Sequence, residues 1–247
     1  MRNIEICCTS VADALEAEKG GAIRIELCTA ISSGGVTPSF GLVKETVSAV
    51  GGAEGIDVNV LIRASEGNFC YSSSQIKVMT EDIRLCRQLG ADGVVIGALT
   101  PDGEIDIDAC KEMVEAAGDM SITFHRAFDA CINPFEALEQ IICLGCDRIL
   151  TSGQKPTATE GAGLLSELVR KADGRIIIMP GSGVNPANIS ELERITRASE
   201  FHSTARKPVR DLCRHHAPEL GFDEPSPGDG LVLRTHSDIV RKLVQTL

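Results

Sequence analysis

Short runs of β-branched and aliphatic residues alternate along the chain with longer stretches whose apolar residues recur every three or four positions. The short runs predict eight strands, at 3–8, 24–29, 57–63, 93–99, 121–128, 148–153, 175–181 and 200–204. The longer stretches predict eight helices, at 11–19, 41–50, 74–89, 107–117, 134–144, 161–172, 186–197 and 238–247. Because a helix follows every strand, we expect the α/β class and a TIM (β/α)8 barrel, in a single domain over 1–247. An open, doubly wound parallel sheet is the alternative.

The predicted helix boundaries carry suitable residues. Asn133-Pro134 and Asn185-Pro186 place a capping side chain before a proline at the first helical position. Gly90 and Gly145 each follow a helix by one residue and precede the next strand by two or three. These short returns from helix to strand favour the barrel.

One segment, 206–234, interrupts this alternation between the last strand and the last helix. It is rich in proline and glycine, so we expect a long loop. Because it follows the last strand, the loop could lie at the C-terminal mouth of the barrel as a lid, or it could be a surface excursion.

Composition and charge narrow the classes of partner. Hydrophobic residues make up 43% of the chain, which has no tryptophan, so aliphatic side chains must fill most of the core. The net charge of −11 argues against a nucleic acid or an anionic membrane as partner, because phosphate-rich surfaces require clustered Lys and Arg. No apolar run reaches the roughly 20 residues that cross a bilayer. A local pocket for a small phosphate stays compatible with this charge.

The ten cysteines do not follow a disulfide or zinc-finger pattern. The N-terminal residues show no apolar segment of a secretory signal, so we expect a cytoplasmic protein with reduced thiols. No pair of CxxC motifs is present, which disfavours a structural zinc site. Most of these cysteines are expected to be small core residues.

Polar residues occupy the positions of five predicted strands that should face the barrel interior. Successive side chains of a strand point to opposite faces, so the alternation places Glu5, Glu26, Arg63, His125 and His202 inside. Glu26, Arg63, His125 and His202 are the candidate catalytic residues, as a source of base, acid and anion clamp. A structural network of salt bridges across the barrel is the alternative interpretation.

Glycines and small hydroxyl residues follow the last three predicted strands. Such loops resemble the phosphate site common in barrels of this class, where backbone N–H groups bind the anion. Glycine could also end these strands for steric reasons alone. The candidate anion-binding residues are Ser152, Gly153, Gly181, Ser182, Gly183 and Ser203.

Two cysteines are candidate metal ligands. Cys7 and Cys28 face inward on adjacent predicted strands, whose backbones lie about 4.8 Å apart. Cu(I) prefers soft thiolate ligands, so this pair could hold one Cu(I). Two buried thiols that only fill space are the alternative, whereas Cys8 should face the helices.

Several strings of residues together resemble the CutC family. They run in order along the chain: EICC at 5–8, IELC at 25–28, GGVTPS at 34–39, NFCY at 68–71, TFHRAFD at 123–129, LTSGQ at 150–154 and FHS at 201–203. The resemblance implies a cytoplasmic TIM-like barrel, often oligomeric and here expected to be a homodimer, linked to copper tolerance or copper binding. After the third strand the family commonly has Arg-Pro-Arg-x-Gly-Asp-Phe, where this chain has RASEGNF at 63–69, so one positive and one negative charge are missing.

Two functions follow as hypotheses. The first is a copper homeostasis protein that binds Cu(I) through Cys7 and Cys28. The second is a barrel enzyme that acts on a small phosphorylated or carboxylated metabolite by acid/base chemistry. Both could use one pocket.

Overall fold

The computed structural model describes residues 3–53, 55–213 and 230–247. Eight parallel strands form one curved sheet in the order β7-β6-β5-β4-β3-β2-β1-β8. Their bounds are β1 Asn3–Cys8, β2 Arg24–Leu27, β3 Asp57–Leu61, β4 Gly93–Ile96, β5 Ser121–Phe124, β6 Arg148–Thr151, β7 Ile177–Pro180 and β8 Glu200–Ser203. Strands β7 and β8 contact each other without a hydrogen-bonded ladder among the described residues, so packing closes the ring.

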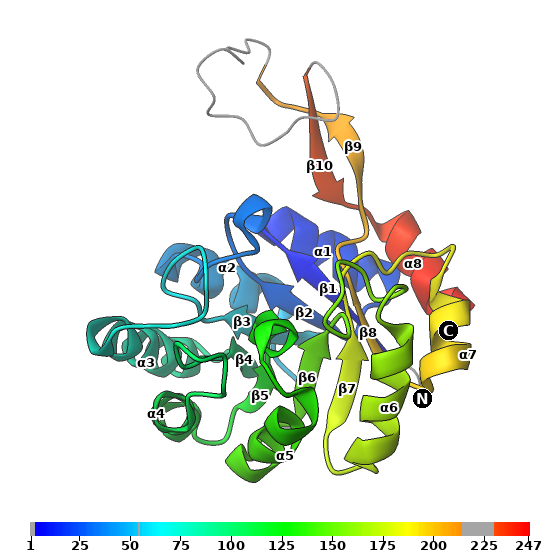
Figure 1. Ribbon diagram of the computed structural model, residues 1–247. Helices are drawn as coiled ribbons and strands as arrows, with labels where there is room; N and C mark the ends of the chain where they lie inside the picture. The colour runs from blue at the N-terminus through cyan, green and yellow to red at the C-terminus, as the bar shows by residue number, and fades with distance from the viewer. Residues whose placement is uncertain (1–2, 54, 214–229) are drawn as a thin grey trace.

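The described residues form eight α-helices. These helices surround the strands in Figure 1. They are α1 Val11–Gly20, α2 Phe40–Val50, α3 Ser73–Gln88, α4 Ile107–Ala117, α5 Pro134–Leu144, α6 Ala162–Ala172, α7 Ile189–Thr196 and α8 Ser237–Thr246. Each strand from β1 to β7 is followed by an α-helix, with a short 3-10 helix in between after β2 and after β5. The predicted TIM-barrel fold is confirmed, and the open doubly wound sheet is excluded.

The two faces of the sheet contribute to two different apolar clusters. The large cluster lies between sheet and helices and contains the outward residues of the strands, among them Ile6, Cys8 and Phe201. A small inner cluster contains Cys7, Cys28, Leu61 and Val95. The predicted register is therefore confirmed for β1 and β2, because Cys7 faces inward and Cys8 faces the helices.

The predicted helix cap is confirmed for α5, whereas α7 begins three residues later than predicted. Asn133 caps α5, where its side chain accepts hydrogen bonds from the amides of residues 135 and 136. The last helix before β8 does not begin at Pro186, because the Asn185 side chain closes a turn on the amide of Ala187. Helix α7 begins at Ile189, after Asn188.

The predicted strand 121–128 is too long. Strand β5 ends at Phe124, and residues Arg126–Ala130 form a short 3-10 helix, η2. The imidazole of His125 caps η2, since its Nδ1 accepts a hydrogen bond from the amide of Ala127 at 3.2 Å. This cap fixes the orientation of His125 at the end of β5.

The prediction of a loop over 206–234 is wrong at both ends. Residues Arg206–Arg210 form β9 and Leu231–Thr235 form β10, and the two pair in antiparallel register with Val209 opposite Val232. This hairpin extends away from the ring of helices in Figure 1. The middle of the predicted loop, 214–229, lies outside the described residues. Among those described, no helix is long and apolar enough to span a membrane.

Candidate functional site

A cavity of about 370 Å³ opens inside the barrel and collects most of the predicted site residues. Glu26, Arg63, His125 and His202 all line it, together with Cys7. A larger groove of about 510 Å³ lies on the outer surface between α3 and α4, but exposed charged side chains line it. We therefore take the inner cavity as the candidate site, because buried polar side chains line it and open onto it.

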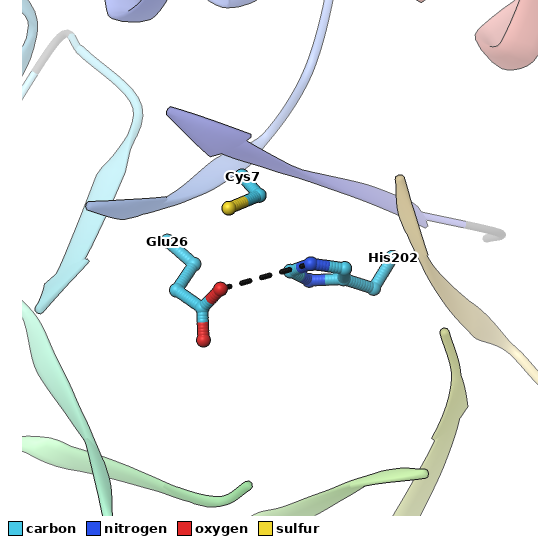
Figure 2. A group of neighbouring side chains, drawn as sticks. All are labelled: Cys7, Glu26 and His202. Carbon is cyan, nitrogen blue, oxygen red and sulfur yellow. Dashed lines mark ion pairs between the residues drawn. The ribbon is translucent and has the colours of Figure 1, made fainter. Parts of the chain in front are cut away.

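One wall of the cavity brings together a thiol, a carboxylate and an imidazole from three adjacent strands (Figure 2). Strand register sets this group, since Cys7 of β1 is opposite Glu26 of β2 and His202 of β8 is opposite Glu5 of β1. The Nε2 atom of His202 lies 3.7 Å from Oε2 of Glu26. The ligand atoms of Cys7, Glu26 and His202 all lie within 4.8 Å of one another.

A buried ionic network supports this wall from below. Arg24 donates to one oxygen of Glu5 and to Glu200, and Arg148 lies 3.3 Å from Glu200. The other oxygen of Glu5 is 2.7 Å from Nδ1 of His202. Although burial raises the pKa of Glu5, the hydrogen bond from His202 and the charge of Arg24 lower it to about 2. Glu5 is therefore ionised.

This network corrects the expected position of Glu5. We predicted that Glu5 shares the cavity with the other four polar residues. Its side chain is fully buried and is absent from the cavity lining, but it forms a hydrogen bond with His202, which does line the cavity. The alternative interpretation, a structural salt-bridge network, thus describes the floor of the barrel.

Glu26 and His202 lie above this floor, and the pKa values of both are raised. Burial, with the nearby charge of Glu5, raises the pKa of Glu26, which His202 partly offsets. Burial alone would lower the pKa of His202, but its hydrogen bond to Glu5 and the charges of Glu26 and Glu5 raise it. Both groups therefore hold a proton more readily than they would in water.

The predicted thiol pair is present in the structure. The Sγ atoms of Cys7 and Cys28 are 3.6 Å apart and both side chains are buried. The hydrogen bond with Cys28 and burial raise the pKa of Cys7 well above its ordinary value, so the metal-free thiol is protonated. Only Cys7 of the two lines the cavity, and Cys28 lies behind it.

Arg63 and His125 bring two further nitrogen donors to the cavity lining. Arg63 is held by the carbonyls of Ser33, Gly35 and Gly67, yet its buried Nε has no partner among the described residues. The Nε2 atom of His125 is also buried and without a partner there. Burial and the charge of Arg63 lower the pKa of His125 to about 3, so the imidazole is neutral. Because its Nδ1 accepts from Ala127, Nε2 carries the hydrogen.

Only part of the predicted anion-binding set reaches the cavity. Ser182, Gly183 and Ser203 line it, and Ser182 and Gly183 both adopt left-handed backbone conformations. The hydroxyl of Ser203 donates to the carbonyl of Val184.

The other predicted anion ligands lie outside the described lining of the cavity. The hydroxyl of Ser152 contacts Asp129 and the carbonyl of Lys155. Gly153 packs against the backbone of Gly161. A Cβ atom on Gly181 would lie 2.4 Å from Cδ1 of Leu150, so a larger residue here would have to displace that side chain.

Sequence reasoning missed three charged residues of the floor. Arg24, Arg148 and Glu200 begin their strands. We had assigned only later residues of β2 and β8 to the interior, and none of β6. The same alternation that placed Glu26 and His202 inside predicts Arg24 and Glu200 inside as well. The signal was therefore available in the strand pattern.

A match to a protein-family model shows how the chain is related to known proteins. The model described as "CutC family" matches residues 2–207. The chain belongs to the CutC family. A CutC family protein of Parabacteroides distasonis is 52% identical over 208 residues, which cover 84% of each chain. Another, from Xanthomonas campestris pv. campestris strain 8004, is 44% identical and covers 99% of this chain and 98% of its own.

Solved structures agree with this membership. CutC from Streptococcus agalactiae, which carries a copper homeostasis name, superimposes with a TM-score of 0.79 at 33% identity, over 83% of this chain and 99% of its own. Phosphoribosylanthranilate isomerase of Thermotoga maritima covers 100% of this chain and 98% of its own, with a TM-score of 0.59 at 12% identity. At that identity the likeness shows the barrel fold alone.

Proposed function

We propose that this protein handles copper in the cytoplasm by binding Cu(I) between Cys7 and Cys28. The observation that carries the proposal is the 3.6 Å separation of two buried Sγ atoms, of Cys7 in β1 and of Cys28 directly after the adjacent β2. Two metal–sulfur bonds of about 2.3 Å would place collinear sulfurs about 4.6 Å apart. The pair therefore needs to open by about 1 Å for linear coordination, or the S–Cu–S angle must bend toward a third ligand.

The donor chemistry supports Cu(I) over harder ions. Thiolates are soft ligands that select Cu(I). Because both thiols are buried and Cys7 is protonated without metal, an incoming ion must displace protons, so affinity should rise with pH. A reducing compartment would keep these two thiols available, which agrees with the absence of a disulfide at Cys7 and Cys28.

A competition titration tests this function. Reduced protein is titrated with Cu(I) under anaerobic conditions against a chromophoric chelator, for wild type and for Cys7→Ser and Cys28→Ser. Loss of supporting side chains around a metal costs 10- to 100-fold in affinity, so loss of either thiol should cost at least about 100-fold. Cys8→Ala is the matched control, because the Cys8 thiol faces the helices. Unchanged affinity in Cys7→Ser/Cys28→Ser would refute the proposal.

A second candidate function is an enzyme acting on a small phosphorylated or carboxylated metabolite. It is favoured by the buried, unpartnered N–H groups of Arg63 and His125 on one wall and by the loop at Ser182 and Gly183. Within the described residues, the amides of that loop donate no hydrogen bond, and such consecutive free N–H groups bind anions. Glu26 and His202 across the cavity would then exchange protons with the ligand.

Thermal-shift screening distinguishes this candidate from copper binding. A ligand at 100 times its Kd stabilises the protein by about 2.7 kcal/mol. We expect a small phosphorylated or carboxylated compound to raise the Tm of wild type, and Arg63→Met to lose that shift. The absence of any shift over a broad panel of phosphorylated and carboxylated metabolites would count against the enzyme.

Assembly as a homodimer remains a proposal. Large apolar side chains are exposed on the outer helices, including Leu15 on α1, Phe40 on α2 and Val78 on α3. Burial of such residues between two copies would remove apolar surface from water, which supports association.

A further inference from the structure

The geometry points to a second metal site in the same cavity. We propose that Cys7, Glu26 and His202 bind a divalent ion of borderline softness, with Zn²⁺ as the best fit, and leave one coordination position open to the cavity. This site goes beyond Cu(I) binding, because it uses two ligands that the thiol pair does not need and leaves Cys28 out.

The spacing of the three donor atoms fits one tetrahedral ion. Ligands about 2.0–2.3 Å from Zn²⁺ lie about 3.3–3.8 Å from one another in a tetrahedron. The distance of 3.7 Å between Nε2 of His202 and Oε2 of Glu26 already falls in this range, and it is too long for a hydrogen bond. The thiol needs only a small approach, since all three donor atoms lie within 4.8 Å of one another.

The hydrogen bond of His202 prepares its ring for a metal. Nδ1 lies 2.7 Å from Glu5, whose other oxygen accepts from Arg24. With Nδ1–H donating to this carboxylate, a neutral ring directs the lone pair of Nε2 toward Glu26 and Cys7. Histidine ligands of metals characteristically donate their other N–H to a carboxylate in this way. The floor of the barrel therefore supplies the orienting carboxylate.

Charge also favours a cation between these groups. Among the described residues, His202 is the only basic group within 4 Å of the buried Glu26 carboxylate. A buried carboxylate is costly without a counter-charge, and a divalent ion would supply it. One sulfur, one oxygen and one nitrogen form a mixed donor set, which suits Zn²⁺ better than Cu(I) or Mg²⁺.

The fourth position would face the cavity. All three ligands line the cavity of about 370 Å³, whereas Cys28 does not. Zinc sites with three protein ligands keep a fourth coordination position for water or a substrate oxygen. Structural zinc sites have four protein ligands and no such open position. A ligand bound there would extend toward Arg63 and His125, which line the same cavity.

Metal-binding measurements on reduced, full-length protein test this site. Zn²⁺ affinity is measured by calorimetry, and Co²⁺ is used as a spectroscopic probe of thiolate ligation and tetrahedral geometry. We expect Glu26→Gln and His202→Gln to weaken Zn²⁺ binding at least about 10- to 100-fold. Cys28→Ser and the control Cys8→Ala should keep Zn²⁺ affinity within a few-fold of wild type. Glu26→Gln leaves the hydrogen bond between Glu5 and His202 intact, so it tests the site even if His202→Gln does not fold.

The two metal proposals fail separately. The Cu(I) site requires Cys28 and not Glu26, whereas the divalent site requires Glu26 and not Cys28. Zn²⁺ affinity that is unchanged in Glu26→Gln, or a Co²⁺ spectrum without a thiolate band, would overturn the divalent site and leave the Cu(I) site standing. Loss of Zn²⁺ binding in Cys28→Ser would also overturn it, because the ion would then use the thiol pair.

Discussion

Replacement of Arg24 by methionine should lower the free energy of unfolding by about 3–5 kcal/mol. Arg24 is 3% exposed and pairs with Glu5 and Glu200 at once. Removal of one partner from a buried ion pair leaves an uncompensated charge, which is the origin of this large cost. Methionine keeps much of the volume of the side chain, so the loss reports on charge more than on packing. Denaturation by urea at pH 7 measures it.

Arg175→Met is the matched control for this experiment. Arg175 makes a two-pronged ion pair with Glu139 on the surface, where both side chains are about half exposed. Solvent screens such pairs, so their contribution to stability is small. An Arg24→Met variant no less stable than the control would show that the floor of the barrel is not a coupled ionic network.

Acidification should destabilise the wild type through His125 far more than it destabilises a His125→Asn variant. Folded His125 takes up a proton only near pH 3, because burial and the charge of Arg63 lower its pKa to about 3 from 6.5. In the unfolded chain the pKa returns to 6.5, so the unfolded state binds this proton first. Its contribution to stability is present above pH 6.5 and is lost as the pH falls toward 3, on the order of 5 kcal/mol in all.

The asparagine variant isolates this contribution. Its side-chain oxygen can accept the hydrogen bond from the amide of Ala127, as Nδ1 does now, but it does not titrate. Urea denaturation of both proteins between pH 7 and pH 4 gives the free energy of unfolding at each pH, and the slopes of the two pH dependences are compared. The raised pKa of His202 acts in the opposite direction, and Glu5 contributes to both proteins, so only the difference between them is diagnostic. Parallel slopes would mean that His125 titrates normally in the fold.

Strand alternation was enough to predict which side chains enter the barrel. It placed Glu26, Arg63, His125 and His202 in one cavity, and it separated Cys7 from Cys8. The reason is geometric, since a period of two fixes the face of every residue once one face is known to be apolar. The helix-facing positions of these strands are aliphatic or aromatic, which fixed the register.

The height of each residue along the barrel axis could not be predicted in the same way. Glu5 and Cys7 both face inward on β1, but only Cys7 reaches the cavity. Height depends on the stagger between neighbouring strands, which pairs Glu5 with His202 on one side and Cys7 with Glu26 on the other. No local pattern in the sequence carries this stagger.

Tertiary contacts explain why some of the predicted anion-binding residues do not line the cavity. Ser152 directly follows β6, yet its hydroxyl and amide both donate hydrogen bonds to Asp129 of η2. Residues 126–128 of that helix were predicted as the end of a strand, so the position of the Asp129 carboxylate after it could not be predicted. The hairpin of β9 and β10 was missed for a related reason, because Pro208 in β9 is typical of a loop or an edge strand.

X-ray absorption at the copper edge of the Cu(I)-loaded protein tests the central claim most directly. That claim is that the inward thiols of β1 and β2 form a metal centre. The account predicts a first coordination shell with two sulfur atoms in wild type, one of which is lost in Cys28→Ser, while the Cys8→Ala spectrum stays that of wild type. A shell of nitrogen and oxygen atoms alone, or a sulfur shell that persists unchanged in Cys7→Ser/Cys28→Ser, would contradict it.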